Sequence, residues 1–160
     1  MLSVTVIVPG KLKEKYLRDA QAEYAKRLTA FCKFNIIEVG VEALPAEPTP
    51  AQVAAALEKE GKRILDAVPK GSFVYALCIE GKQRSSEAFS RELDRLAVSG
   101  SSHVTFLIGS SFGLSDEVKQ FADATLSMSE MTFPHQLARV MLMEQLYRAF
   151  HISTGGKYHK

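Results

Sequence analysis

Apolar and polar positions follow two alternating patterns along the chain. Five apolar runs rich in β-branched residues predict strands at residues 2–8, 34–39, 73–79, 104–108 and 124–128. Segments with helical spacing or good helix formers predict helices near residues 17–28, 51–68, 89–96, 116–121 and 134–150. Strands that alternate with helices favour an α/β fold with a mostly parallel five-stranded sheet and helices on both faces. We therefore expect a single domain spanning residues 1–160.

The last predicted helix is apolar on more than one side. Pro134 suits its first turn, because the fixed φ of proline matches the helix and the missing N–H has no partner there. Thr132 is placed to cap this helix. The consecutive apolar residues Val140–Met143 project in directions about 100° apart, so one flat core cannot cover them all. This pattern predicts that the helix packs on its own sheet and on a second subunit, in a homodimer.

Three polar loops each follow a predicted strand and precede a predicted helix. They cover residues 80–86, 109–114 and 127–133, and two of them contain glycine. In open parallel sheets the ligand crevice lies at the carboxyl ends of the strands, where all three loops would emerge. Any one of them alone is typical of an ordinary connection, whereas the three together favour a ligand site.

Composition and charge exclude few functions. The chain has 46% hydrophobic and 24% charged residues, which is typical of globular proteins, and a net charge of +2. This small charge gives no overall basic signature, so a nucleic acid would have to be bound by local patches. One such patch is the cluster Lys11, Lys13, Lys15 and Arg18, although a short charge run is more often a solvated helix start.

Cysteine usage and the N-terminus indicate the cellular compartment. Cys32 and Cys78 lie far apart in apolar runs without metal-like spacing, which predicts buried free thiols in a reducing compartment and no metal site. The N-terminus has neither the basic start nor the cleavage site of a signal peptide. No apolar run approaches the roughly 20 residues of a membrane span. We therefore expect a cytoplasmic protein with no membrane partner.

One motif suggests a different chemistry. Gly109–Gly113 reads G-x-S-x-G between a strand and a helix, as the nucleophile turn of a serine hydrolase would. Ser111 would be the nucleophile, and its acid and base partners would come from Asp116, Asp123, His135, His151 and His159. The chain is short for a hydrolase scaffold and shows no separate oxyanion-loop sequence. We favour a role for the glycines in holding a backbone turn against a cofactor, with the hydrolase as an alternative.

The C-terminal part of the chain holds further candidates. Glu144 and Arg148 are spaced for an i,i+4 ion pair. His135 is placed for a hydrogen bond at the helix start, and Arg139 either points into the crevice or lies at the surface. The tail Tyr158–Lys160 combines an aromatic ring, an imidazole and a cation, which suits gripping a nucleotide, although a frayed terminus is the default.

Over essentially its whole length the sequence resembles the RlmH family of SPOUT-class RNA methyltransferases. The matching segments are Gly10–Glu14, Gly109–Leu114, Leu126–Gln136, Glu144–Phe150 and Tyr158–Lys160. The continuous block from Leu126 to Phe150 is highly specific, whereas the glycine loop alone would be weak. One residue departs from the pattern, because the family usually has two glycines at the start of the middle loop and here Ser110 follows Gly109.

The resemblance implies a fold, an assembly and a reaction. The expected fold is a SPOUT-type sheet whose C-terminal segment forms a trefoil knot, and the expected assembly is a homodimer. The implied activity is methyl transfer from S-adenosylmethionine to N3 of a pseudouridine in the 23S RNA of the large ribosomal subunit, with the assembled ribosome as substrate. A non-catalytic ribosome-binding module is the remaining alternative.

The resemblance also implies roles for individual residues. The cofactor-binding residues would be Leu77, Gly109, Met128, Ser129, Glu130, Met131, Thr132 and Phe133. Apart from the resemblance, the chemistry requires the N3 proton of the target base to leave to a general base or to solvent, and we favour His159 as the residue near the base. Tyr158 and Arg139 or Arg148 would hold the nucleotide.

Overall fold

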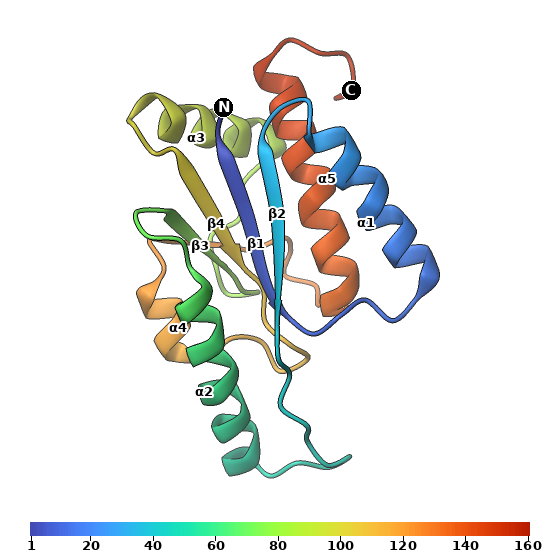
Figure 1. The fold of residues 1–160 in the computed structure, drawn as a ribbon, viewed down its shortest axis with the longest axis vertical. Helices are drawn as coiled ribbons and strands as arrows, with labels where there is room; N and C mark the ends of the chain where they lie inside the picture. The colour runs from blue at the N-terminus through green and yellow to red at the C-terminus, as the bar shows by residue number, and fades with distance from the viewer.

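The computed structural model describes all residues from 1 to 160 and contains five strands and five helices (Figure 1). In chain order they are β1 (Ser3–Pro9), α1 (Lys15–Leu28), β2 (Lys33–Val39), α2 (Pro50–Ala67), β3 (Phe73–Leu77), α3 (Ser86–Val98), β4 (His103–Leu107), α4 (Asp116–Phe121), β5 (Ala124–Leu126) and α5 (His135–Ser153). This order confirms the predicted alternation.

The five strands form one parallel sheet in the order β2-β1-β4-β3-β5. The inner strands β1, β3 and β4 are almost completely buried, as expected for strands covered on both faces. All strands end at the same edge, so the loops that follow β3, β4 and β5 are neighbours. The predicted five-stranded parallel α/β sheet is confirmed, and the trefoil knot stays a prediction.

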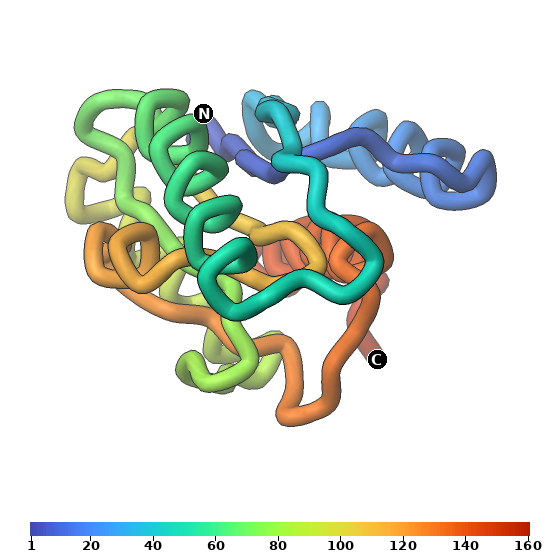
Figure 2. The backbone as a smooth tube through the Cα atoms, turned by 90° about the horizontal axis from the view of Figure 1, so that it is seen from below, coloured from blue at the N-terminus to red at the C-terminus, as the bar shows by residue number.

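Helices cover both faces of the sheet. One core contains Leu28 of α1, Phe89 of α3 and Leu142 of α5 together with the side chains of one sheet face. The other core contains Ile64 of α2 and Val118 of α4. Figure 2 shows α2 and α4 on one side of the molecule and α1 and α5 on the other. None of the helices is both long and apolar enough to cross a membrane.

The start of α5 differs from the expectation. The helix begins at His135, and Pro134 precedes it as the cap residue, whose carbonyl accepts the amide of Ala138 at 2.9 Å. No side chain caps this end, so the prediction that Thr132 caps the helix is wrong. Thr132 lines a cavity instead and is available to a ligand.

The apolar sides of α5 are covered largely by the same chain. The helix lies between α1 and α3 and against the sheet. Val140, Leu142 and Met143 are therefore at most 8% exposed, and only Met141 of the four consecutive apolar residues is partly open. The inference that covering these residues requires a second subunit is wrong, because α1, α3 and the sheet already surround the helix.

β3 and β5 end two residues earlier than predicted, at Leu77 and Leu126. After β3 the chain turns at once, because the amide of Gly81 donates to the carbonyl of Cys78 at 3.1 Å. After β5 the amide of Ser127 donates to the carbonyl of Lys82 at 3.0 Å, which ties the two loops together. These early ends leave the residues that follow both strands free to line a cavity.

Candidate functional site

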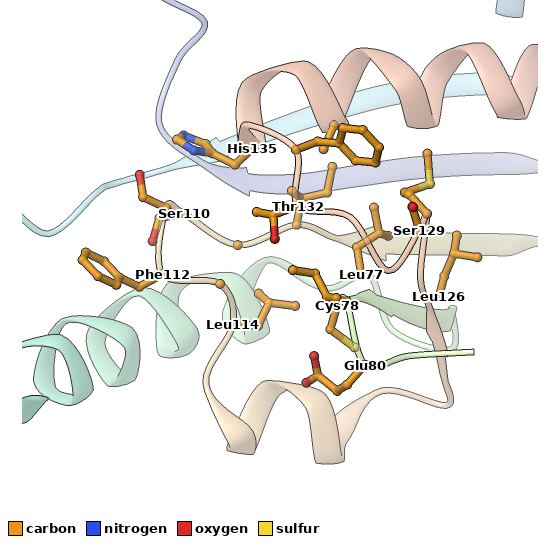
Figure 3. Close-up of a pocket in the computed structure, with 18 of the residues that line it drawn as sticks. Leu77, Cys78, Glu80, Ser110, Phe112, Leu114, Leu126, Ser129, Thr132 and His135 are labelled. Carbon is orange, nitrogen blue, oxygen red and sulfur yellow. The ribbon is translucent and has the colours of Figure 1, made fainter. Parts of the chain in front are cut away.

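A cavity of about 320 Å³ lies at the carboxyl ends of β3, β4 and β5 (Figure 3). All three loops that the sequence pointed to contribute to it. Its apolar walls include Leu77, Ile108, Leu114, Leu126 and Phe133. A volume in this range, with mostly apolar walls and a few polar groups, is typical of small-molecule sites.

Seven of the eight predicted cofactor residues line this cavity. They are Leu77, Gly109, Met128, Ser129, Met131, Thr132 and Phe133. Glu130 is exposed and does not line the cavity. The structure therefore places Glu130 in the right loop but away from the cavity.

The loop after β4 is a narrow turn that requires glycine at its start. A Cβ atom on Gly109 would lie 2.2 Å from the carbonyl carbon of Gly113, so no other residue fits without moving the backbone. The amide of Gly113 donates to the carbonyl of Ser110 at 2.8 Å, and Gly113 itself has a φ of +84°. The Ser110 hydroxyl donates to the carboxylate of Glu60 in α2 at 2.7 Å. This loop is thus held both internally and from α2.

The loop before α5 is braced by serine side chains. The hydroxyl of Ser127 donates to the carbonyl of Ser129 at 3.0 Å, and the hydroxyl of Ser129 accepts the amide of Met131 at 3.0 Å. Met131 extends from this braced turn and is 72% exposed, although it also lines the cavity. Hydrogen bonds made by the side chains of Ser127 and Ser129 therefore fix the backbone turns that form this wall of the cavity.

Two charged residues at the cavity, Glu80 and Lys119, were not singled out individually from the sequence. The ammonium of Lys119 lies 2.6 Å from the carboxylate of Glu80, and this hydrogen bond lowers the pKa of Glu80 and raises that of Lys119. His135 also lines the cavity, where burial and then the neighbouring Arg139 charge lower its pKa, so its imidazole is neutral at pH 7. The position of Glu80 just after a buried strand is the one sequence signal that pointed to the Glu80–Lys119 pair, whereas His135 was already a candidate at the start of the last helix.

Only one of the two cysteines is buried. Cys32 lies in the core, and burial raises its pKa to about 12. Cys78 is partly exposed and lines the cavity, so the prediction of a buried thiol is wrong for it. Burial, followed by the charge of Glu80, raises the pKa of Cys78 as well, so both thiols are protonated and weakly nucleophilic at neutral pH.

The second group of predicted residues gathers around Glu144 in α5. Its Oε2 atom accepts the Tyr158 hydroxyl at 2.8 Å and Arg148 Nη2 at 2.7 Å, which confirms the predicted ion pair with Arg148. The Arg148 guanidinium lies over the Tyr158 ring at 4.8 Å. His159 contacts Arg148 through Nδ1 and Glu87 of α3 through Nε2. The tail is therefore docked onto α3 and α5, and the default of a frayed terminus is wrong.

The contacts of His159 define its hydrogen positions. Arg148 can only donate, so Nδ1 of His159, at 3.0 Å, accepts and carries no proton. Nε2 lies 2.6 Å from a carboxylate oxygen of Glu87 and therefore donates. In this arrangement the lone pair of the neutral imidazole is already taken by Arg148. Tyr158 also stays protonated, because burial and then its bond to Glu144 raise its pKa.

Arg139 is not part of this cluster. Its side chain is 0% exposed and lies 2.8 Å from Glu38 of β2, while its other nitrogen donates to the carbonyl of Gly10 at 2.9 Å. It also donates to Gln21 of α1 at 3.2 Å. The expectation that Arg139 lies either in the crevice or at the surface is wrong, because it is a buried link between α5, α1 and the sheet.

The geometry of a serine hydrolase is absent. Ser111 is exposed and makes no hydrogen bond to a histidine or a carboxylate. The imidazoles of His151 and His159 are engaged with Tyr147 and with Arg148 and Glu87. Asp123 accepts the amide of Val74 at 2.8 Å and so has a structural role. The G-x-S-x-G match therefore reflects a backbone turn.

Comparison with known proteins identifies the family of the chain. The family model described as "Predicted SPOUT methyltransferase" matches residues 2–159. Proteins called "Ribosomal RNA large subunit methyltransferase H" from Ligilactobacillus salivarius and Exiguobacterium sibiricum are each 51% identical over 159 residues, which is 99% of this chain and 100% of each relative.

A solved structure gives the same result at the level of the fold. The structure of a probable methylase family protein from Haemophilus influenzae Rd KW20 matches with a TM-score of 0.60 at 15% identity, over 100% of this chain and 72% of that one. Identity this low supports the fold alone. The family model and the full-length relatives carry the assignment further: the chain belongs to the SPOUT methyltransferase family.

Proposed function

We propose that this protein transfers a methyl group from S-adenosylmethionine to N3 of a pseudouridine in large-subunit 23S ribosomal RNA, acting in the cytoplasm on the assembled ribosome. The observation that carries the proposal is the cavity at the end of β3, β4 and β5, which gathers seven residues of the predicted cofactor set. Full-length relatives named for large-subunit ribosomal RNA methylation support the substrate class.

The residues of the cavity fit the methyl donor. Leu77, Leu114, Leu126 and Phe133 offer the apolar slot that an adenine ring needs. Gly109 permits a close backbone approach, since any Cβ there would collide with the turn. Glu80 and Lys119 provide one charge of each sign at the cavity, which suits the hydroxyls and the amino-acid end of the donor. No cluster of side chains suited to a metal ion is present.

The bound donor would supply a methyl group attached to a positively charged sulfur. The sulfur keeps the electron pair of the carbon–sulfur bond when that bond breaks. The protein must then align the pseudouridine N3 with that methyl group and remove the N3 proton. In the proposal Arg148 and Tyr158 hold the nucleotide, and His159 accepts the proton. Because the lone pair of His159 is engaged by Arg148, His159 must exchange this contact for the substrate before it can act as the base.

A local basic surface supports RNA as the substrate. Residues 11–33 contain seven lysines and arginines but only three acids, although the whole chain has a net charge of +2. All seven cations are exposed on α1 or the segments beside it, and they are Lys11, Lys13, Lys15, Arg18, Lys26, Arg27 and Lys33. Such a surface can contact RNA phosphates without an overall basic protein.

A homodimer is part of the proposal. Two large apolar side chains near the start of α5 are open in the single chain, since Met131 is 72% and Leu137 is 37% exposed. They lie beside the cavity and along the outer face of α5, where a second copy would cover them.

The proposal is tested by transfer of a labelled methyl group from S-adenosylmethionine, comparing ribosomes that lack the modification with naked ribosomal RNA. We expect label on a pseudouridine at N3, with ribosomes strongly preferred. Cofactor binding without transfer to either substrate would show that the substrate is wrong. Absence of both binding and transfer would refute the enzyme and favour the non-catalytic ribosome-binding module.

A further inference from the structure

A second cavity of about 380 Å³ adjoins the first. It lies between α3 and α5, and it shares Leu126 and Met128 with the candidate cofactor cavity as a common wall. Glu144, which holds Tyr158 and Arg148, lines the second cavity. The second cavity therefore adjoins the cofactor cavity, and Glu144 links it to the cluster of tail residues.

The walls of the second cavity suit a flat neutral ring. Phe89, Met141 and Leu142 are apolar, while Ser86 of α3 donates to Gln145 of α5 at 2.7 Å. Gln145 in turn donates to Glu144 at 3.1 Å. An amide and a hydroxyl can each both donate and accept, so this pair can match the alternating carbonyl and N–H groups of a uracil-type base.

The charges in this cavity do not favour a phosphate. Arg84 lines it, but its guanidinium is bound to Glu92 and donates to the carbonyls of Lys82 and Thr125. Its side chain is 5% exposed, and Glu92 offsets its charge. Glu144 is a further carboxylate that would repel an anion. The cavity is thus better matched to a nucleobase than to the backbone of the RNA.

We propose that this second cavity holds the target pseudouridine base, with Ser86 and Gln145 reading its polar edge and Met128 at the border of the two cavities. The inference rests on the proposed methyltransferase function. A transferase must bring donor and acceptor into contact, and cavities that adjoin at Leu126 and Met128 place the two ligands next to each other.

Substitutions at the α3–α5 bridge test the proposal. Ser86→Ala and Gln145→Ala should each lower kcat/KM for the ribosome by about tenfold, since a group that reads a base edge is lost, and should change S-adenosylmethionine affinity by less than about twofold. Ser153→Ala is the matched control, because Ser153 of α5 makes an equivalent bridge to Asp94 of α3 at 2.7 Å away from the cavity. The control should keep the wild-type kinetics.

Methionine methyl groups locate the base directly. Met131 lines only the cofactor cavity, Met141 only the second cavity, and Met128 both, while Met143 is fully buried and lines neither. In protein with labelled methionine methyls and saturated with S-adenosylhomocysteine, pseudouridine nucleoside should shift the NMR signals of Met141 and Met128 and leave those of Met131 and Met143 in place.

The outcomes separate this inference from the proposed function. If Gln145→Ala and Ser153→Ala have equal kinetics on ribosomes, or if the nucleoside shifts the signal of Met131 and not that of Met141, the second cavity does not hold the base. Turnover by the wild-type protein in the same assays would still support the methyltransferase function. No wild-type turnover on ribosomes or RNA would instead remove the proposed function on which the inference rests.

Discussion

The hydroxyl of Ser110 donates to the Oε1 atom of Glu60 at 2.7 Å, and this bond ties the glycine turn of the cofactor cavity to α2. Glu60 is 3% exposed, and its other oxygen accepts the amide of Glu42 at 3.1 Å. The next residue, Gly61, allows Ser115 to approach closely, because a Cβ atom there would lie 2.9 Å from the Ser115 hydroxyl. Two consecutive residues of α2 therefore position the segment after β4: Glu60 binds Ser110, and Gly61 leaves room for Ser115.

Ser110→Ala should loosen this turn and weaken the binding of S-adenosylmethionine by about tenfold, because a hydrogen bond to a buried carboxylate is lost. Ser153→Ala is the matched control, since its hydroxyl donates to a carboxylate at the same distance of 2.7 Å but lies away from the cofactor cavity. Titration calorimetry would measure both affinities, and amide hydrogen exchange in residues 109–115 would report the loosening without any ligand. Equal affinities and exchange rates in the two variants would contradict this role of Ser110.

Arg139→Ala should destabilise the fold by about 3 kcal/mol, because it leaves Glu38 without its cation and opens a gap where a fully buried side chain linked α1, β2 and α5. Arg148→Ala, at an ion pair whose side chains are 24% and 19% exposed, should destabilise the fold less than Arg139→Ala and should instead lower turnover. Urea unfolding of the two variants gives the comparison. An Arg139→Ala protein of wild-type stability would show that the buried network contributes little.

The alternation of patterns was sufficient to predict the fold class, because strand and helix periods differ and each element here keeps one of them. The strand ends were predicted two residues too long at β3 and β5, since apolar side chains such as Ile79 and Met128 continue the pattern past the last ladder bond. These residues are apolar because they line cavities, which periodicity cannot distinguish from strand burial. The apolar sides of α5 were likewise attributed to a second subunit, because the sequence of one helix does not show that α1 and α3 pack against it.

The site was predictable in its loops and less so in its side chains. Parallel strands bring the loops after β3, β4 and β5 together whatever their sequence, so the position of the cavity followed from the order of elements. The burial of Arg139 did not follow, because its partners Glu38 and Gly10 are 101 and 129 positions away. The engagement of His159 with Glu87 likewise depends on how the tail folds back onto α3.

His159→Ala should reduce turnover on ribosomes without changing S-adenosylmethionine affinity, because the imidazole lies in the tail cluster and does not line the cofactor cavity. A proton acceptor of this kind contributes roughly 10²- to 10⁴-fold to the rate. Lys157→Ala, an exposed neighbour in the same tail, is the control. Full turnover in His159→Ala would remove His159 as the general base and leave solvent to take the proton.

Acidification should release the tail. Burial raises the pKa of Glu144, but the hydrogen bonds from Arg148 and Tyr158 outweigh it and leave the pKa below its usual range. A carboxylate with a depressed folded pKa contributes stability that is complete above the ordinary glutamate pKa of about 4.3 and is lost as the pH falls through the folded value. NMR signals of residues 155–160 should therefore keep their dispersion at neutral pH and lose it when the pH is lowered below the ordinary range of a glutamate.

The substitution Tyr158→Phe tests whether protonation of Glu144 causes the release of the tail. It removes one of the hydrogen bonds that hold the Glu144 carboxylate ionised while keeping the ring against Arg148 and Tyr147. The folded pKa of Glu144 is then less depressed, so the midpoint of tail release should move to higher pH. A midpoint that moves to lower pH, or does not move, would mean that another carboxylate, such as Glu87 beside His159, controls the docking of the tail.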